Sequence, residues 1–285
     1  MAARPRTLPA AIAPVLVGTS LAIRYGTFHP LAFIAALLGA MLIQVGTNLS
    51  NDYSDARRGA DSDERIGPVR VTAGGLVPPR QVLIATYLTF GAAVLCGAYL
   101  IAVAGWALLA VGAASILAGV LYTGGPRPYG YEGLGEAFVF LFFGIVAVTG
   151  SYFVQRKGLP WQAFALSVPV GLLITAILVV NNVRDIDTDR RAGKRTLAVR
   201  MGRERTRVLF AVMVAAAFLT SWVPWVAGSL SPWLFLTAAA APLGVGVVQT
   251  MRTRADGPSL NLALARTAKL ALIFCLLLCA GVLAS

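Results

Sequence analysis

Two apolar runs of the chain end in short acidic clusters, at residues 48–55 and 181–189. The clusters read Asn48-Leu-Ser-Asn51-Asp52-Tyr-Ser-Asp55 and Asn181-Asn182-Val-Arg184-Asp185-Ile-Asp187-Thr-Asp189. The chain has 12 acidic residues among 285, and five of the 12 lie in these clusters. A carboxylate costs roughly 2.5–3.5 kcal/mol at the centre of a bilayer and less toward its surface, so acids that end apolar runs indicate a functional site.

The spacing within each cluster repeats. Asn48 precedes Asp52 by four residues, and Asn181 precedes Asp185 by four, so each pair projects from one face of a helix. A further aspartate follows each pair by about one turn. Two facing arrays of oxygen ligands suit Mg²⁺, which binds carboxylates together with the oxygens of a phosphate.

The composition excludes a soluble fold. The mean hydropathy is +0.76, 58% of the residues are hydrophobic and 13% are charged. We therefore expect an all-α integral membrane protein. Apolar stretches of roughly the 20 residues that a spanning helix needs predict nine transmembrane helices. They cover residues 7–24, 30–51, 83–104, 106–123, 135–154, 162–182, 206–227, 233–250 and 264–284.

The distribution of positive charge predicts a cytoplasmic N-terminus. Of the 24 Lys and Arg residues, all but Arg24, Arg156 and Lys157 then lie on the cytoplasmic side, as the positive-inside rule requires. The five tryptophans fall at or near the outer ends of helices, where an interfacial belt forms. The net charge of +12 is spread over membrane loops, which favours contact with membrane lipid, and no nucleic-acid partner is expected.

The order of the helices predicts one transmembrane domain over residues 1–285. The acidic clusters end the second and sixth stretches, so residues 7–123 and 135–250 are expected to form two repeats of four helices. Residues 264–284 would add a ninth helix. Four spans in each repeat bring both clusters to the same membrane face. A transporter could also be built from repeats, but its acids would be expected near the midplane rather than at helix ends.

Basic residues follow both clusters. The loop 52–82 mixes acids with Arg65 and Arg70, which could bind phosphate or could pair with the acids of a solvated loop. The loop after the second cluster carries Lys194 and Arg195, whose charges would neutralise a diphosphate.

A third loop, residues 122–136, is expected on the same face. It contains Arg127 and three tyrosines, beginning with Tyr122. The tyrosines could bound an aromatic substrate, or they could anchor the loop at the membrane interface.

These motifs resemble the UbiA superfamily of intramembrane prenyltransferases, which carries paired acidic motifs on the second and sixth of nine helices. Within it, the chain is most similar to the menaquinone-pathway branch that acts on 1,4-dihydroxy-2-naphthoate. The similarity to this branch lies in residues 4–18, 67–72, 122–136 and 193–200.

The resemblance implies transfer of a polyprenyl group from polyprenyl diphosphate to 1,4-dihydroxy-2-naphthoate, with loss of CO₂ and diphosphate, giving demethylmenaquinone. It places the enzyme in the cytoplasmic membrane of a prokaryote, with the active site facing the cytoplasm. Other members, which share the acidic motifs, act on 4-hydroxybenzoate, haem or lipid acceptors.

The resemblance also assigns roles to residues. Asp52 and Asp55 would hold one Mg²⁺, and Asp185 and Asp189 another, with Mn²⁺ as a substitute; these four are the expected catalytic residues. The expected substrate-binding residues are Asn48, Arg65, Arg70, Tyr122, Arg127, Asn181, Lys194 and Arg195.

Overall fold

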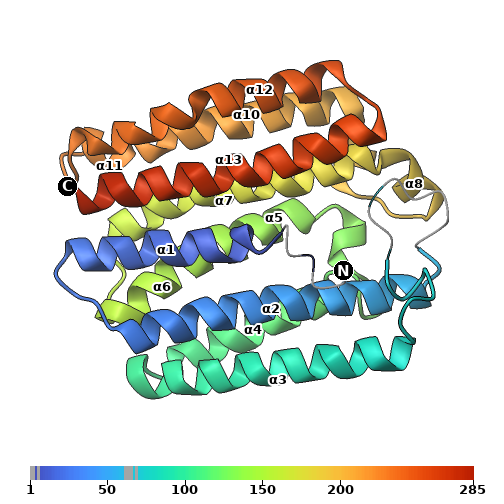
Figure 1. The fold of residues 1–285 in the computed structure, drawn as a ribbon, viewed down its shortest axis with the longest axis horizontal. Helices are drawn as coiled ribbons and strands as arrows, with labels where there is room; N and C mark the ends of the chain where they lie inside the picture. Colours follow the sequence, from blue (N-terminus) through green and yellow to red (C-terminus); the bar gives the residue numbers. More distant parts are fainter. Residues whose placement is uncertain (1–3, 5–6, 61–66, 68–69) are drawn as a thin grey trace.

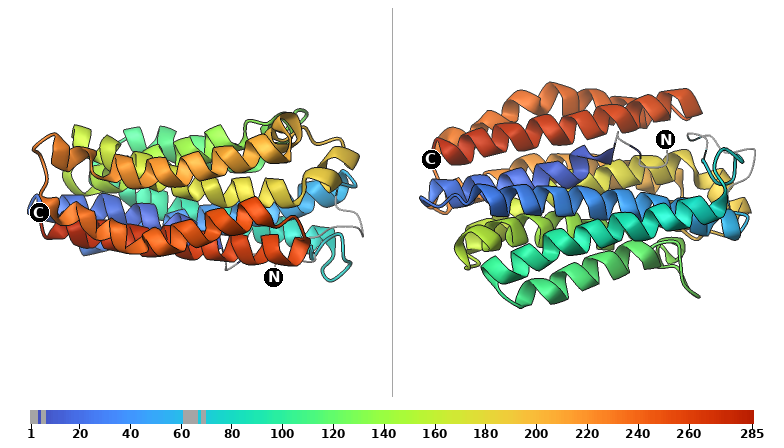
Figure 2. Two further views of the ribbon diagram at one scale, coloured as in Figure 1. Left: turned by 90° about the horizontal axis from the view of Figure 1, so that it is seen from above. Right: turned by 60° about the horizontal axis from the view of Figure 1, so that its bottom comes forward.

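The computed structural model describes residue 4, residues 7–60, residue 67 and residues 70–285. Over these residues the chain forms helices and no strands, which confirms the all-α prediction. Figures 1 and 2 show the long helices running roughly along one common axis. The first half contains α1 (Pro9–Arg24), α2 (Pro30–Arg57), α3 (Pro79–Ala104) and α4 (Ala107–Leu121).

The second half begins with one continuous span that changes its helical type. Its parts are α5 (Gly135–Val139), the π-helical segment η3 (Phe140–Val146) and α6 (Ala147–Arg156). The remaining long helices are α7 (Trp161–Arg184), α10 (Arg203–Ser221), α12 (Ala241–Thr253) and α13 (Gly257–Leu283). Short helical segments join them: η2 (Tyr129–Glu132), α8 (Ile186–Arg191), α9 (Leu197–Met201), α11 (Val223–Val226) and η4 (Pro232–Ala240).

Seven helical stretches in the described part of the chain are long and apolar enough to cross a membrane. They correspond to seven of the nine predicted spans. The other two predicted spans correspond to α1, with 16 residues, and α4, with 15 residues, which are apolar but shorter. The chain is a multi-pass membrane protein, while the count of nine crossings stays a prediction.

Helix α2 extends further than the apolar pattern indicated. The predicted span ended at residue 51, but the helix continues to Arg57. Hydrophobicity marks the bilayer core and not the helix end, so the pattern missed this last part. Asp52 and Asp55 lie within this last part of the helix, as the helical spacing of the cluster indicated.

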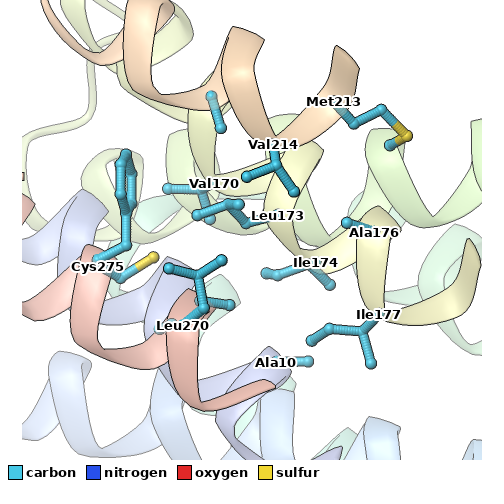
Figure 3. Packing of buried hydrophobic residues seen from close by; sticks show 14 of the residues in the cluster. Ala10, Val170, Leu173, Ile174, Ala176, Ile177, Met213, Val214, Leu270 and Cys275 are labelled. Carbon is cyan, nitrogen blue, oxygen red and sulfur yellow. The ribbon is translucent and has the colours of Figure 1, made fainter. Parts of the chain in front are cut away.

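The core of the bundle surrounds α7. Figure 3 shows the buried side chains of α7 packed against those of α1, α10 and α13. The residues labelled there are Ala10, Val170, Leu173, Ile174, Ala176, Ile177, Met213, Val214, Leu270 and Cys275. By contrast, α3 exposes large apolar side chains such as Leu88 and Leu95, which are 69% and 74% exposed and suit a lipid-facing surface.

A close helix crossing holds η3 against α7. A Cβ added at Gly144 would lie 2.6 Å from the Cα of Gly171, so a larger residue would force the two backbones apart. Small residues at such crossings allow membrane helices to approach closely. This crossing fixes η3 against the middle of α7.

Both acidic helix ends lie at the same end of the bundle. Figure 1 shows the C-terminal ends of α2 and α7 near α8, whereas the C-terminus of the chain lies at the opposite end. At that opposite end Arg24 donates to the Ser285 carbonyl at 2.6 Å, and Arg156 donates to the Tyr25 carbonyl. Two of the three basic residues predicted on the outer side are therefore separated from the acidic ends by the length of the bundle.

Candidate active site

A cavity of about 530 Å³ lies between the two acidic helix ends and continues between the helices. Its polar end is lined by Asn51 and Asp55 from α2, by Asn181 from α7, and by Asp185, which directly follows α7. Side chains of α3, α4, η3 and α6 give much of the remainder an apolar lining. A volume in this range and an apolar lining with a few convergent polar groups are typical of a small-molecule site.

One face of α2 carries a row of polar side chains into the cavity. Gln44, Asn48, Asn51 and Asp55 follow one another at intervals of four, three and four residues, which keeps them on one helix face. Asp52 is outside this row and does not line the cavity. Its carboxylate accepts hydrogen bonds from two backbone amides of the following loop, those of residues 71 and 72, at 3.3 and 2.9 Å.

Three separate segments meet at Asp55. Its carboxylate pairs with Arg70 at 3.0 Å and with the Lys194 ammonium at 3.5 Å, and it accepts a hydrogen bond from the Tyr131 hydroxyl at 2.6 Å. The side chain is 2% exposed. A buried carboxylate needs such partners because its unpaired charge would be costly in a low-dielectric environment.

Asp185 has a different partner. The guanidinium of the adjacent Arg184 donates to both carboxylate oxygens, at 2.7 and 2.6 Å. Arg184 is itself buried and also donates to the amide oxygens of Asn181 and Asn261, each at 2.8 Å. The cation beside Asp185 is therefore fixed within the helix bundle.

An aromatic wall borders the cavity near Asp55. Tyr122 and Tyr129 line the cavity, their rings packed edge to face with centroids 5.4 Å apart, and Tyr129 stacks on Phe138 at 4.0 Å. Burial raises the pKa of the Tyr129 phenol above its ordinary value. The phenol therefore stays protonated and donates to the Ala118 carbonyl at 2.8 Å.

The donor set of the polar end fits Mg²⁺. Asp55, Asp185 and Asp189 supply carboxylates, and Asn51 and Asn181 supply amide oxygens. Across the described residues, no three His, Cys, Asp or Glu side chains gather closely enough to hold a metal ion by themselves. Mg²⁺ commonly binds one or two carboxylates and completes its shell with water and substrate phosphate, so donors divided between two helix ends suit a metal–diphosphate site.

A family model described as the UbiA prenyltransferase family matches residues 11–273. The chain belongs to this family. It is 42% identical to the 1,4-dihydroxy-2-naphthoate octaprenyltransferase of Mycobacterium tuberculosis, over 99% of this chain and 95% of the relative. It is 40% identical to the enzyme of the same name from Escherichia coli, over 99% of this chain and 94% of the relative. The family predicted from the motifs is thus confirmed.

Solved structures of family members share the fold. A UbiA homolog from Aeropyrum pernix matches with a TM-score of 0.72 at 15% identity, over 97% of each chain. A UbiA homolog from Archaeoglobus fulgidus, bound to GPP and Mg²⁺, matches with a TM-score of 0.68 at 15% identity, over 99% of this chain and 98% of that chain. At these identities the likeness is one of fold.

The structure divides the predicted site residues of this family member into two groups. The residues that line the cavity are Asn48, Asp55, Arg70, Tyr122, Asn181, Asp185, Asp189 and Lys194. Asp52, Arg127 and Arg195 do not line it, and the last two are exposed. Arg195 instead fixes the loops to each other, because its backbone amide donates to the Tyr131 carbonyl at 2.8 Å. Arg65 lies outside the described residues.

Several polar residues of the site were not predicted from the sequence. Asn51 stands four residues before Asp55, just as Asn181 stands before Asp185, and this shared spacing could have identified it. Glu136 is buried and accepts a hydrogen bond from Asn182, a cavity-lining residue, at 2.9 Å. Nothing in its local sequence indicated that contact across the bundle.

Proposed function

We propose that this chain transfers a polyprenyl group from polyprenyl diphosphate to 1,4-dihydroxy-2-naphthoate. The reaction releases diphosphate and CO₂ and yields demethylmenaquinone in its reduced, dihydroxy form. The observation that carries the proposal is one cavity lined by both Asp55 and Asp185, with polar groups at one end and apolar walls beyond. Relatives that carry the corresponding octaprenyltransferase name are 36–42% identical over 99% of this chain and support the choice of acceptor.

The polar end is the proposed diphosphate site. Asp55 with Asn51, and Asp185 and Asp189 with Asn181, would hold Mg²⁺ or Mn²⁺. A bound divalent ion would neutralise charge that develops on the departing diphosphate. In this proposal Asp52 positions the loop that carries Arg70, whose backbone amides it accepts, and does not ligate metal, since its side chain does not line the cavity.

Two cations of the chain would act on the same leaving group. Arg70 and Lys194 are paired with Asp55, and both line the cavity. When a diphosphate enters, these side chains exchange one anionic partner for another without becoming buried unpaired charges. Charge-assisted hydrogen bonds to phosphate then stabilise the negative charge as the allylic C–O bond breaks.

The remaining chemistry needs a dry cavity and a correctly placed ring. The allylic carbon forms a bond to the ring carbon that bears the carboxylate. The bond from that carbon to the carboxylate then breaks, and its electron pair restores the aromatic ring as CO₂ leaves. No ring proton has to be removed, so no protein base is required. In this proposal the apolar helices and the aromatic wall that line the cavity would keep water from the allylic cation, which water would otherwise capture.

The direct test uses purified protein, Mg²⁺, one polyprenyl diphosphate and naphthoate labelled with ¹⁴C in the carboxyl group. We expect one labelled CO₂ for each prenyl group transferred. 4-Hydroxybenzoate should be a poor acceptor, because it lacks the second ring and so loses apolar burial and alignment of the attacking carbon. A prenylated product that retains the label, or a preference for hydroxybenzoate, would overturn the acceptor assignment.

We propose further that the polar end faces the cytoplasm of a prokaryotic cell, that the N-terminus is cytoplasmic, and that residues 7–123 and 135–250 are two repeats. Single cysteines at Arg57 and Arg191 should then react with an impermeant label from the cytoplasmic side, and one at Lys157 from the outer side. Labelling of all three from one side would contradict this topology.

A further inference from the structure

The faces that α2 and α7 present to the cavity have the same spacing but different chemistry. On α2 the residues are Gln44, Asn48, Asn51 and Asp55, and on α7 and its C-cap they are Ile174, Leu178, Asn181 and Asp185. Near the helix ends the two faces match. Farther from the helix ends, the α2 residues Gln44 and Asn48 carry amides, whereas the corresponding α7 residues, Ile174 and Leu178, are apolar.

Gln44 is the deepest amide of this row. Its side chain is buried, and its Nε2 donates to the Thr7 hydroxyl oxygen at 3.1 Å. The Nδ2 of Asn48 donates to the same oxygen at 3.2 Å, and the Thr7 hydroxyl donates to the Arg4 carbonyl at 2.9 Å. Thr7 therefore fixes which way the Gln44 amide points. Among the described residues Gln44 makes no other side-chain hydrogen bond, so its carbonyl oxygen remains available as an acceptor.

The position of Gln44 suits contact with the aromatic acceptor, at the end of the bound substrates that lies farthest from the diphosphate. It precedes Asp55 by 11 residues on one helix, which is about 16 Å along the axis at 1.5 Å per residue. A diphosphate at Asp55, followed by the reacting carbon and a fused two-ring acceptor, occupies a comparable length. The polar edge of the acceptor would then lie along α2, and its ring would pack against the apolar side chains of α7.

We propose that the Gln44 carbonyl oxygen accepts a hydrogen bond from a ring hydroxyl of the aromatic acceptor, with Thr7 positioning the amide. This inference rests on the proposed function, because it assigns the part of the same cavity that recognises the acceptor. A buried hydroxyl without a partner is costly, so a correctly placed carbonyl selects acceptors that carry the hydroxyl. Gln44 is thus a specificity-determining residue, and the diphosphate end does not depend on it.

The test compares Gln44→Leu with the wild type in two assays. In the first, we expect the KM for 1,4-dihydroxy-2-naphthoate to rise about tenfold, the scale of one hydrogen bond, with the KM for polyprenyl diphosphate unchanged. In the second, 1-hydroxy-2-naphthoate and 4-hydroxy-2-naphthoate, which each lack one ring hydroxyl, are measured as competitive inhibitors. One of them should bind the wild type about tenfold more weakly than 1,4-dihydroxy-2-naphthoate, which carries both ring hydroxyls. This difference in binding should disappear in Gln44→Leu.

Controls separate a binding role from a structural one. Gln249→Leu makes the same change on α12, away from the cavity, and should leave both KM values unchanged. Thr7→Val keeps Gln44 but removes the hydroxyl that fixes its amide, so it should weaken the hydroxyl discrimination severalfold and provides the test if Gln44→Leu does not fold.

The outcomes distinguish this inference from the proposed function. Suppose that the wild-type enzyme prenylates naphthoate and that Gln44→Leu and Thr7→Val discriminate between the inhibitors as well as the wild type does. That result would overturn the inference and leave the proposed function intact. Equal rises in the KM values of both substrates would also overturn the inference, because they indicate a structural role. A wild-type protein that does not prenylate naphthoate would overturn the proposed function and the inference with it.

Discussion

The C-terminal ends of α2 and α7 carry the same Asn-x-x-x-Asp spacing but stabilise their aspartates differently. Asp55 on α2 is held by Arg70, Tyr131 and Lys194, which come from three different loops. Asp185, which directly follows α7, is held by Arg184, the last residue of that helix. The α7 end is thus built into the bundle, whereas the α2 end is completed by loops. In the proposed function, the loops therefore place the cations Arg70 and Lys194 beside the diphosphate, whereas the end of α7 keeps a fixed position in the bundle.

The largest expected effect follows from the fixed cation. Arg184→Met would leave the buried Asp185 without its charged partner, so we expect a loss of about 3–5 kcal/mol in the free energy of unfolding. Arg200→Met is a suitable control, because Arg200 pairs with Glu132, both side chains are about half exposed, and such surface pairs contribute little. Thermal unfolding in detergent measures both. Equal stability of the two variants would show that the α7 end is not a fixed element.

The next prediction separates the two aspartates of α2. Asp55→Asn should lower kcat at least about a hundredfold, on the scale of losing a major electrostatic stabiliser. Asp52→Asn should lower it about tenfold, because it weakens the hydrogen bonds that position the Arg70 loop but removes no group from the cavity. Steady-state turnover of folded protein decides. An equal loss in the two variants would place Asp52 in the diphosphate site.

This pair of residues also shows where the sequence stops being informative. The apolar runs and the two clusters predicted the helices and their common end, because hydrophobicity and charge act at the level of whole helices. Asp52 and Asp55 each stand four residues after an asparagine, so spacing alone could not choose which one faces the cavity. The loop that binds Asp52 makes the choice, and its contacts depend on the folded bundle.

The positions of loop side chains were also hard to predict, because they too depend on contacts that form only in the folded bundle. Arg127 and Arg195 were expected at the site because they lie in stretches that resemble the family, yet both side chains are exposed and neither lines the cavity. Gln44 lies in an apolar run, and its contact with Thr7 becomes visible only when α1 and α2 are packed together. Residues that act through contacts between distant segments leave no local pattern.

A smaller effect should follow from removing one loop cation. Lys194→Met keeps Arg70 and Tyr131 on Asp55, so the protein should fold normally. We expect the KM for polyprenyl diphosphate to rise about tenfold, the scale of one charge-assisted hydrogen bond, with the KM for naphthoate unchanged. Initial rates with each substrate varied in turn provide the measurement. A change confined to the KM for naphthoate would show that Lys194 binds the acceptor and not the diphosphate.

In the proposed function, the α2 and α7 ends act together on one diphosphate. The most direct test is a double-mutant cycle with Asp55→Asn, Asp185→Asn and the variant that carries both changes, followed by kcat/KM for polyprenyl diphosphate. Groups that act as a unit are strongly non-additive, so the double variant should lose little more than the worse single variant. A loss equal to the product of the two single losses would mean that the two ends act independently and that they do not share one diphosphate.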